Sequence, residues 1–226
     1  MEKLSRQQVI ELSKTKGNAS GYDLSGVNLS KLDLIAMRFK GSVLKGANLS
    51  GVNASMSDFD DTDMSGSNLS SANFIGARFS RANLEKSDLT FSSFLGADFS
   101  GANLKDADFT NSRISSANFE KADLSGANIQ MTEAVLARMV HAVIRNTNAR
   151  ASSMIGADLS HADLRGAMLH GTDMNGATLV SADLREASLL ETALIAADLS
   201  NADLRQATLR GADMTRAKRE GMKSDS

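Results

Sequence analysis

An apolar residue recurs every five positions through most of this chain, without exception. Every residue whose number ends in 4 or 9, from Leu24 to Met214, is apolar, although only 42% of the 226 residues are hydrophobic. Two residues before these positions, every residue from Ser57 to Ala212 is Ala, Ser or Thr. A period of five matches neither the α-helical turn of about 3.6 residues nor the two-residue alternation of a β-strand. The backbone must therefore return to the same orientation after five residues.

The glycines indicate where such a backbone turns. All of them except Gly17 carry numbers ending in 1 or 6, which is one fixed point of the repeat. Glycine adopts positive φ angles without strain, so these positions are expected to form corners. A chain that turns once per repeat directs one large and one small side chain inward from every side. Because the period is unbroken over nearly the whole length, it predicts one continuous solenoid.

Phenylalanine indicates the number of repeats in each coil. Five Phe residues recur at 20-residue steps: Phe39, Phe59, Phe79, Phe99 and Phe119. A square coil of four repeats would stack these rings in one column. With about 4.8 Å between coils, roughly ten coils give a rod on the order of 45 Å long. Backbone hydrogen bonds would run from coil to coil, and the absence of Pro agrees with this because each Pro removes one donor.

The repeats resemble those of the pentapeptide-repeat family. The segment Ala97–Gly101 (ADFSG) is one example, and the resemblance extends from Tyr22 to about Ala217. It implies an all-β solenoid, a right-handed quadrilateral β-helix with the Leu or Phe and the small residue two before it packed inside. Bulky residues replace the small residue near the start, which predicts wider or irregular first coils. These residues are Tyr22, Val27, Leu32, Met37 and Val52.

Three segments are expected along the chain. Residues 1–21 form an N-terminal cap, with a short helix over 5–16 and a linker, in which Ser5 is the N-cap and Gln8 follows three residues later. Residues 22–217 form the pentapeptide-repeat β-helix. Residues 218–226 form a flexible polar tail that has almost nothing to bury, which would leave the C-terminal coil available for pairing in a homodimer.

The segment 132–146 admits two interpretations. It is rich in helix formers, which favours an inserted helix. However, Ala134, Met139 and Ile144 keep the large apolar column, and an insertion would preserve the later register only if its length were divisible by five. Degenerate coils are therefore favoured over an inserted helix.

The composition excludes several classes of protein. Lys and Arg number 25 and Asp and Glu 27, for a formal charge of −2, so neither a polybasic nucleic-acid surface nor an overall polyanion is present. Without Cys there is no disulfide framework and no thiolate metal site. We find no signal-like or membrane-spanning apolar stretch, so the expectation is a cytoplasmic protein that contacts neither a membrane nor nucleic acid directly.

No group of residues resembles an active site. His141 and His161 lie 20 residues apart in the same outward column, but no carboxylate or third His stands nearby in that column, as a metal site would require. The many serines, such as Ser100, occupy a turn position without a His and carboxylate partnership. We therefore expect neither an enzyme nor a bound cofactor or metal.

An aliphatic stripe is the strongest candidate for a binding surface. Six residues share one outward position of the 20-residue coil, where the other sides mostly carry Ser, Thr, Lys or Arg. They are Ile35, Ile75, Leu95, Val135, Ile155 and Ile195. A contiguous exposed apolar stripe usually marks an interface. The alternative is that these side chains simply pack against one another along the sheet.

A row of arginines is a second candidate surface. Arg145, Arg165, Arg185 and Arg205 follow at 20-residue steps, and an Asp stands two residues before each of the last three. The guanidinium groups could bind phosphates or carboxylates of a partner. The alternative, which we favour, is a neutralised surface lattice in which each Arg relieves repulsion between the Asp residues.

These observations favour a non-enzymatic rod that binds or scaffolds another protein, of unknown identity, through one side. A second hypothesis follows from the resemblance, because some family members mimic DNA and protect gyrase and topoisomerase IV from quinolones. The small net charge and the polar C-terminal tail argue against it. A bacterial effector delivered to a host cell is a further alternative.

Overall fold

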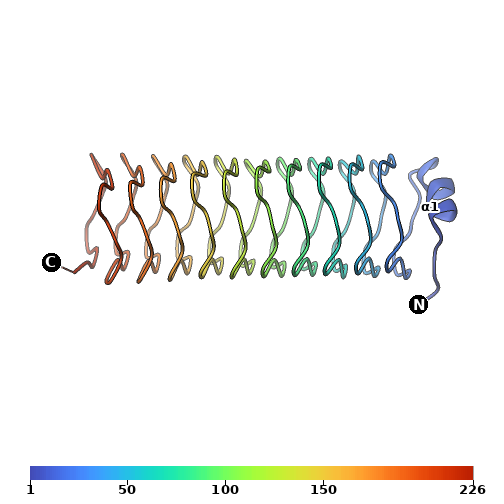
Figure 1. Cartoon of the computed structure of the whole chain (residues 1–226), viewed down its shortest axis with the longest axis horizontal. Coiled ribbons are helices and arrows are strands. Elements are labelled where there is room, and N and C mark those ends of the chain that lie inside the picture. The colour runs from blue at the N-terminus through green and yellow to red at the C-terminus, as the bar shows by residue number, and fades with distance from the viewer. Residues whose placement is uncertain (226) are drawn as a thin grey trace.

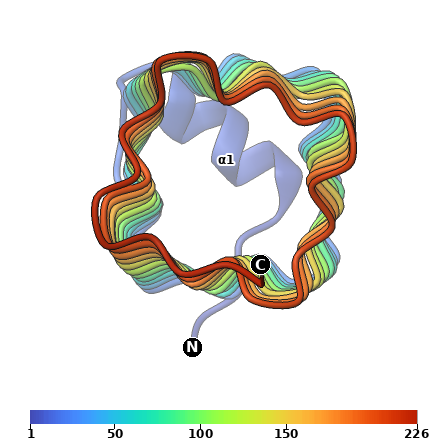
Figure 2. The same ribbon diagram turned by 90° about the vertical axis from the view of Figure 1, so that its left-hand side faces the viewer.

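The computed structural model describes residues 1–225, which form a rod of stacked coils with one helix, α1, at the N-terminal end (Figure 1). Parallel bridges join residues 20 apart, from Lys3↔Asp23 at one end to Asp203↔Lys223 at the other. Each coil therefore takes four five-residue repeats, and each repeat makes one corner. Seen along the axis, the coils superpose with only a slight progressive rotation (Figure 2).

Coils are joined by isolated bridges instead of longer strands throughout residues 1–225, because only one short extended segment separates successive corners. The amide of Leu84 donates to the carbonyl of Asn103 in the next coil at 2.7 Å, whereas the amide of Asn83 donates to Thr62 in the previous coil at 2.8 Å. Each repeat thus bonds to both of its neighbours. This satisfies backbone groups that would otherwise be buried without partners.

Every corner requires one residue in the left-handed region. Gly101 has a φ of 65°, and Lys121, at the same point of the next coil, has a φ of 59°. Glycine adopts this conformation without strain, whereas the Cβ of any other residue makes it less favourable. The position of the glycines in the repeat is thereby explained.

The core is the column of large apolar residues together with the small column beside it. From Leu24 to Leu204, every residue of the large column is at most 1% exposed. The Phe rings stack as expected: the centroids of Phe59 and Phe79 lie 5.1 Å apart with rings 6° from parallel. Phe74 meets both rings edge-on, at 5.8 Å and 5.4 Å. The interior is therefore filled by side chains and leaves no channel along these coils.

The helix α1 spans Arg6–Ser13, so the expected end at residue 16 is wrong. The predicted capping box is present, with Ser5 and Gln8 bonded reciprocally. The helix ends early because the amide of Gly17 donates to the carbonyl of Leu12 at 2.9 Å while Lys16 turns to a φ of 50°. This arrangement is a Schellman motif, which stops a helix.

Helix α1 lies across the opening of the first coil (Figure 2). Val9 is fully buried and joins the core, and Leu4 and Leu12 pack against it half-buried. The Arg6 guanidinium donates to the backbone carbonyls of Asn28 at 2.6 Å and Ser30 at 3.1 Å. The helix thus covers both apolar surface and unpaired carbonyls at this end.

Coil pairing extends further at both ends than the expected range 22–217. Asn18 already pairs with Arg38, and Ala19 is fully buried. At the other end Lys218 pairs with Asp198, and Met222 packs half-buried against the core. The expected polar tail 218–226 therefore continues the coil as far as Lys223, and Ser226 lies outside the described residues.

The irregular segments suggested by the sequence follow the same coil. Within 132–146, bridges join Glu133 to Arg113 and Val143 to Asp123, so the favoured prediction of degenerate coils is confirmed and an inserted helix is excluded. In the first coils Met37 and Val52 are buried at the small position, and bridging keeps its 20-residue step. The prediction of wider or irregular first coils is therefore wrong for their pairing, and Tyr22, Val27 and Leu32 are half-buried at the small position.

Candidate protein interface

Two residues of each repeat form the corner and present their side chains to the surface. They carry numbers ending in 5 and 6 or in 0 and 1, and each coil has four such corners. We use the name apolar corner for the row that begins with Ile35 and Ala36, recurs every 20 residues, and ends with Ile195 and Ala196. Successive coils touch directly in this row, because the amide of Gly76 donates to the carbonyl of Leu95 at 2.9 Å.

The structure places all six predicted stripe residues in the apolar corner. Ile75, Ile155 and Ile195 are exposed, at 40%, 40% and 37%. The other three, Ile35, Leu95 and Val135, are half-buried. Packing against neighbouring coils therefore covers part of each side chain and leaves an apolar edge in contact with solvent, which is interrupted where Ser115 and Ser116 occupy both corner positions.

Two prominent members of this corner, Met56 and Leu136, were not predicted from the sequence and are 70% and 63% exposed. Both occupy the left-handed corner position, with φ angles of 60° and 57°. Each leans over the glycine of the next coil: a Cβ built on Gly76 or Gly156 would lie 2.8 Å from the Met56 or Leu136 side chain. Aligning the second corner position at a period of 20 would have found them.

The apolar corner also lacks charge. From Ile35 to Ala196 neither of its two positions carries Asp, Glu, Lys or Arg, whereas each of the other three corners carries at least two of them. Removing such a surface from water needs no ion to be desolvated, so its burial against a partner is favourable.

A second apolar group lies on the neighbouring corner, where Phe91 is 64% and Met131 47% exposed. Phe91 is held at a φ of 58°, an unusual conformation for a bulky residue. Between the two corners runs a side of the rod that carries Ser93 and the ion pair of Arg113 with Glu133 at 3.1 Å. Apart from Met1, all exposed large hydrophobic residues described in 1–225 belong to these two corners.

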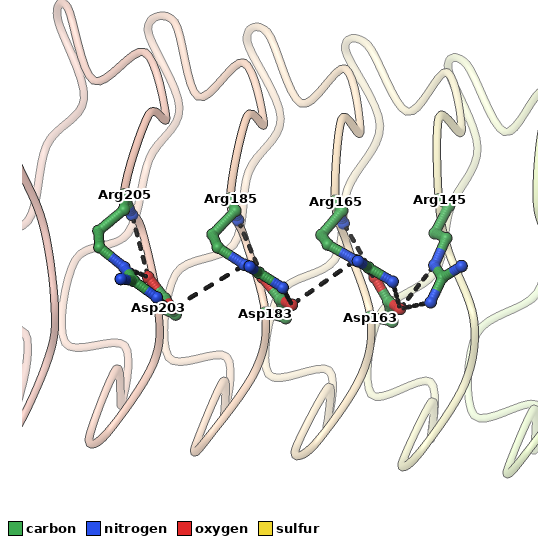
Figure 3. Close-up of polar contacts among 7 residues, drawn as sticks. All are labelled: Arg145, Asp163, Arg165, Asp183, Arg185, Asp203 and Arg205. Carbon is green, nitrogen blue, oxygen red and sulfur yellow. Dashed lines mark hydrogen bonds and ion pairs between the residues drawn. The ribbon is translucent and has the colours of Figure 1, made fainter.

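The arginine row lies on the corner opposite the apolar corner. Its guanidinium groups form ion pairs with Asp163, Asp183 and Asp203 (Figure 3). The Nε of Arg145 donates to Asp163 at 2.6 Å, and Arg165 holds the same carboxylate with two bonds of 2.9 Å. Arg185 binds Asp183 in the same way, at 2.8 and 2.6 Å. The row is thus a lattice of alternating charge.

The carboxylates of this lattice titrate at low pH. Partial burial raises the pKa of Asp163, but hydrogen bonds from Arg165 and Arg145 outweigh it and hold the pKa well below its usual range. The hydrogen bond from Arg205 lowers the pKa of Asp203 to about 2. Because each guanidinium has a carboxylate partner, the geometry supports the neutralised lattice more than an anion-binding ladder.

Two of the three histidines, His141 and His161, are exposed on neighbouring coils. The imidazoles of His141 and His161 stack at 4.9 Å, 17° from parallel. Among the residues that the structure describes, no group of three or more His, Cys, Asp or Glu could hold a metal ion. The single described helix is too short and too polar to cross a membrane.

Comparison with known proteins agrees with the coil. The family model for pentapeptide repeats matches in eight copies, and the matched segments include 23–66, 57–90, 67–106, 92–130, 102–139, 142–179 and 177–216. The chain belongs to the pentapeptide-repeat family. Pentapeptide-repeat proteins with matching structures form right-handed β-helices.

Two solved pentapeptide-repeat structures are similar along most of their length. HetL, involved in heterocyst differentiation regulation in the cyanobacterium Nostoc sp. strain PCC 7120, is 26% identical with a TM-score of 0.52, and the match covers 97% of this chain and 96% of HetL. The plasmid-mediated fluoroquinolone resistance protein QnrB1 is 22% identical with a TM-score of 0.50, covering 78% and 92%. The latter likeness concerns the fold alone. A search of curated protein sequences gives no match.

Proposed function

We propose that this pentapeptide-repeat protein is a non-enzymatic binding or scaffolding rod that recognises another protein through its apolar corner. In this proposal the rod is a right-handed quadrilateral β-helix of about ten coils, which keeps the corner straight and rigid. A rigid surface loses little conformational entropy when a partner binds.

The observation that carries the proposal is the row of exposed apolar side chains along the apolar corner. Eight bulky apolar side chains lie along it without an intervening charge: Ile35, Met56, Ile75, Leu95, Val135, Leu136, Ile155 and Ile195. Exposed apolar surface that carries no charge is typical of a protein interface. HetL, which is similar over nearly its whole length, is involved in the regulation of heterocyst differentiation, and a regulatory role through binding fits the proposal.

The charge distribution favours this proposal over DNA mimicry. A DNA mimic needs a continuous negative side, but Asp163, Asp183 and Asp203 are each paired with arginine. Their field is therefore largely cancelled at short range. A gyrase supercoiling assay with and without a quinolone tests the alternative, and we expect neither inhibition nor protection.

A pull-down from cell extract tests the proposal. The bait is the intact protein, compared with the double variant Ile75→Lys and Leu95→Lys, which places two charges in the apolar corner. We expect the variant to lose the proteins captured by the wild type, because the partner would have to desolvate two unpaired ammonium groups.

The matched control is the double variant Val140→Lys and Val180→Lys. Both valines are half-buried at the first corner position, but on a different corner. This control should capture the same proteins as the wild type. Equal capture by all three baits would show that the apolar corner is not the interface.

A further inference from the structure

The first position of the apolar corner carries similar residues in both directions from Ser115. Residues equally distant from Ser115 have the same character. Ile75 and Ile155 match, as do Leu95 and Val135. The outer pairs match as well: Ser55 with Asn175, and Ile35 with Ile195. A surface of this kind is complementary to a second copy of itself in the opposite direction.

The second corner position adds complementarity of size. Its two bulky residues correspond to glycines under the same symmetry: Met56 to Gly176, and Leu136 to Gly96. Met56 and Leu136 are the most exposed side chains of the corner, at 70% and 63%. A protruding side chain on one copy would therefore meet an open backbone surface on the other.

The neighbouring row of outward residues adds complementarity of charge. Bridges join it into one continuous line along the rod, from Arg38 to Asp198. Residues equally distant from Asn118 in this line carry opposite charges in three cases. The pairs are Arg38 with Asp198, Arg78 with Asp158, and Asp98 with Arg138.

In an antiparallel dimer, each of these three rows faces the same row of the second copy. An isologous dimer of antiparallel rods has its two-fold axis in the interface and perpendicular to the rods. The operation reverses the direction along the rod but keeps each row on its own side of the corner. Each row therefore faces itself, with its order reversed about the axis.

The row on the other side of the apolar corner contains Arg113, which lies in the same coil as Ser115. In the proposed dimer Arg113 would therefore face Arg113 of the second copy. Arg113 is already paired with Glu133 at 3.1 Å within its chain, so two neutral pairs would meet there. Arg78 and Arg138 currently bind Asp60 and Glu120. The interchain charges therefore act by attraction over a distance, which favours specificity and association rate more than affinity.

We propose that the apolar corner binds a second copy of this chain in an antiparallel side-by-side dimer, with the two-fold axis at Ser115. This inference rests on the proposed function, because it names a partner for the same surface. The eight coil steps from Ile35 to Ile195 give a contact about 40 Å long. A contact this narrow is at the low end of specific interfaces, so the dimer is weak and concentration-dependent.

Disulfide trapping tests the pairing directly, because the native sequence contains no cysteine. In the Ser115→Cys variant the two thiols would face each other across the axis. We expect at least about tenfold more disulfide-linked dimer than for Ser65→Cys, because contact raises the effective concentration of the second thiol. Ser65 is a matched control, half-buried at the same repeat position on the opposite corner.

The direction of pairing is tested with Ile75→Cys and Ile155→Cys. Antiparallel pairing predicts that a mixture of the two variants forms the mixed disulfide dimer, whereas each variant alone gives no more than Ser65→Cys. Cross-linking of each variant with itself would indicate parallel rods and would overturn the proposal. A dimer in sedimentation that none of these thiols traps, as expected for pairing through the C-terminal coils, would also overturn it.

The two proposals fail in different ways. A single monomer mass in sedimentation at every concentration, together with background trapping of Ser115→Cys, overturns self-pairing. Loss of captured proteins on Ile75→Lys and Leu95→Lys would then still support a different protein partner. If capture is also unchanged, the apolar corner is not a protein interface of either kind.

Discussion

At the residue scale, the corner φ angle is the most demanding feature of each repeat. The structure holds many residues with a Cβ in the left-handed region, among them Ala36 and Phe91. Each of these costs roughly 1–2 kcal/mol relative to the ordinary backbone regions. The cost is tolerated because the same corner amide bonds to the neighbouring coil, as for Ala36, which donates to Ser55 at 2.9 Å.

We predict opposite effects for two substitutions at this corner position. Gly46 has a φ of 63° and nothing within 4 Å of a built Cβ, so Gly46→Ala should lower the stability by about 1 kcal/mol through backbone strain alone. Ala36→Gly should raise it by up to about 1 kcal/mol, because the φ of 57° becomes free of strain. Urea unfolding of both variants checks the prediction, and a shift in the same direction for both would contradict it.

A second prediction at this scale concerns pH. The pKa of Asp203 is lowered to about 2 by Arg205, compared with about 4 in an unfolded chain. The unfolded state therefore binds more protons between these values, so the stabilisation is present above about pH 4 and is lost as the pH falls through 2. The Asp203→Asn variant has no carboxylate at this position and therefore lacks this pH-dependent stabilisation.

Urea midpoints of the wild type and Asp203→Asn, measured from pH 6 to pH 2, test this prediction. The wild type should be the more stable protein above pH 4, and the difference should shrink towards pH 2. A difference that is constant over the whole range would show that the ion pair does not stabilise the fold.

At the element scale, the coil is stabilised by repetition of one contact pattern. The Phe stack is the clearest case, since Phe79 has parallel neighbours at 5.1 Å and 4.8 Å and edge-on neighbours at 5.4 Å and 6.0 Å. Other coils place Leu at the same position of the repeat. The backbone therefore accepts either residue, and only the ring contacts distinguish them.

We accordingly predict that Phe79→Leu keeps the fold but lowers its stability by about 1–3 kcal/mol, from lost ring contacts and imperfect packing. The control Leu124→Met changes another buried residue at the large apolar position of the repeat, and it should lower the stability by less than about 1.5 kcal/mol. Circular dichroism and urea unfolding provide the measurements. Equal destabilisation by both substitutions would indicate that ring stacking contributes nothing specific.

At the scale of the whole molecule, the rod separates fold from surface. Each coil contacts mainly its neighbours, and the core column is continuous from Leu24 to Leu204. The apolar corner lies outside this column. Changes at the corner can therefore alter binding without altering the coil.

The double variant Ile75→Lys and Leu95→Lys provides a test of this separation. We expect its free energy of unfolding to change by no more than about 1 kcal/mol, because the lysine stems can cover the same surface with their amines in water. A monomeric sample measured by urea unfolding is the appropriate material. A much larger loss would mean that the corner residues belong to the core and that the binding experiments report on folding.

The sequence by itself determined the coil and its columns. Each repeat makes the same contacts with its neighbours, so the local period of five, the glycine positions and the Phe spacing of 20 all specify one structure. It also placed the six stripe residues on one corner. Aligning the second corner position at the same 20-residue step would also have revealed Met56 and Leu136.

The tertiary structure decided what repetition does not encode. The early end of α1 depends on Gly17 reaching the Leu12 carbonyl, and the coil continues to Lys223 because its backbone pairs with Asp203. Whether the Arg165 guanidinium meets Asp163 or solvent depends on side-chain rotamers. Ends and long surface side chains have contacts that differ from one repeat to the next, so only the folded molecule fixes them.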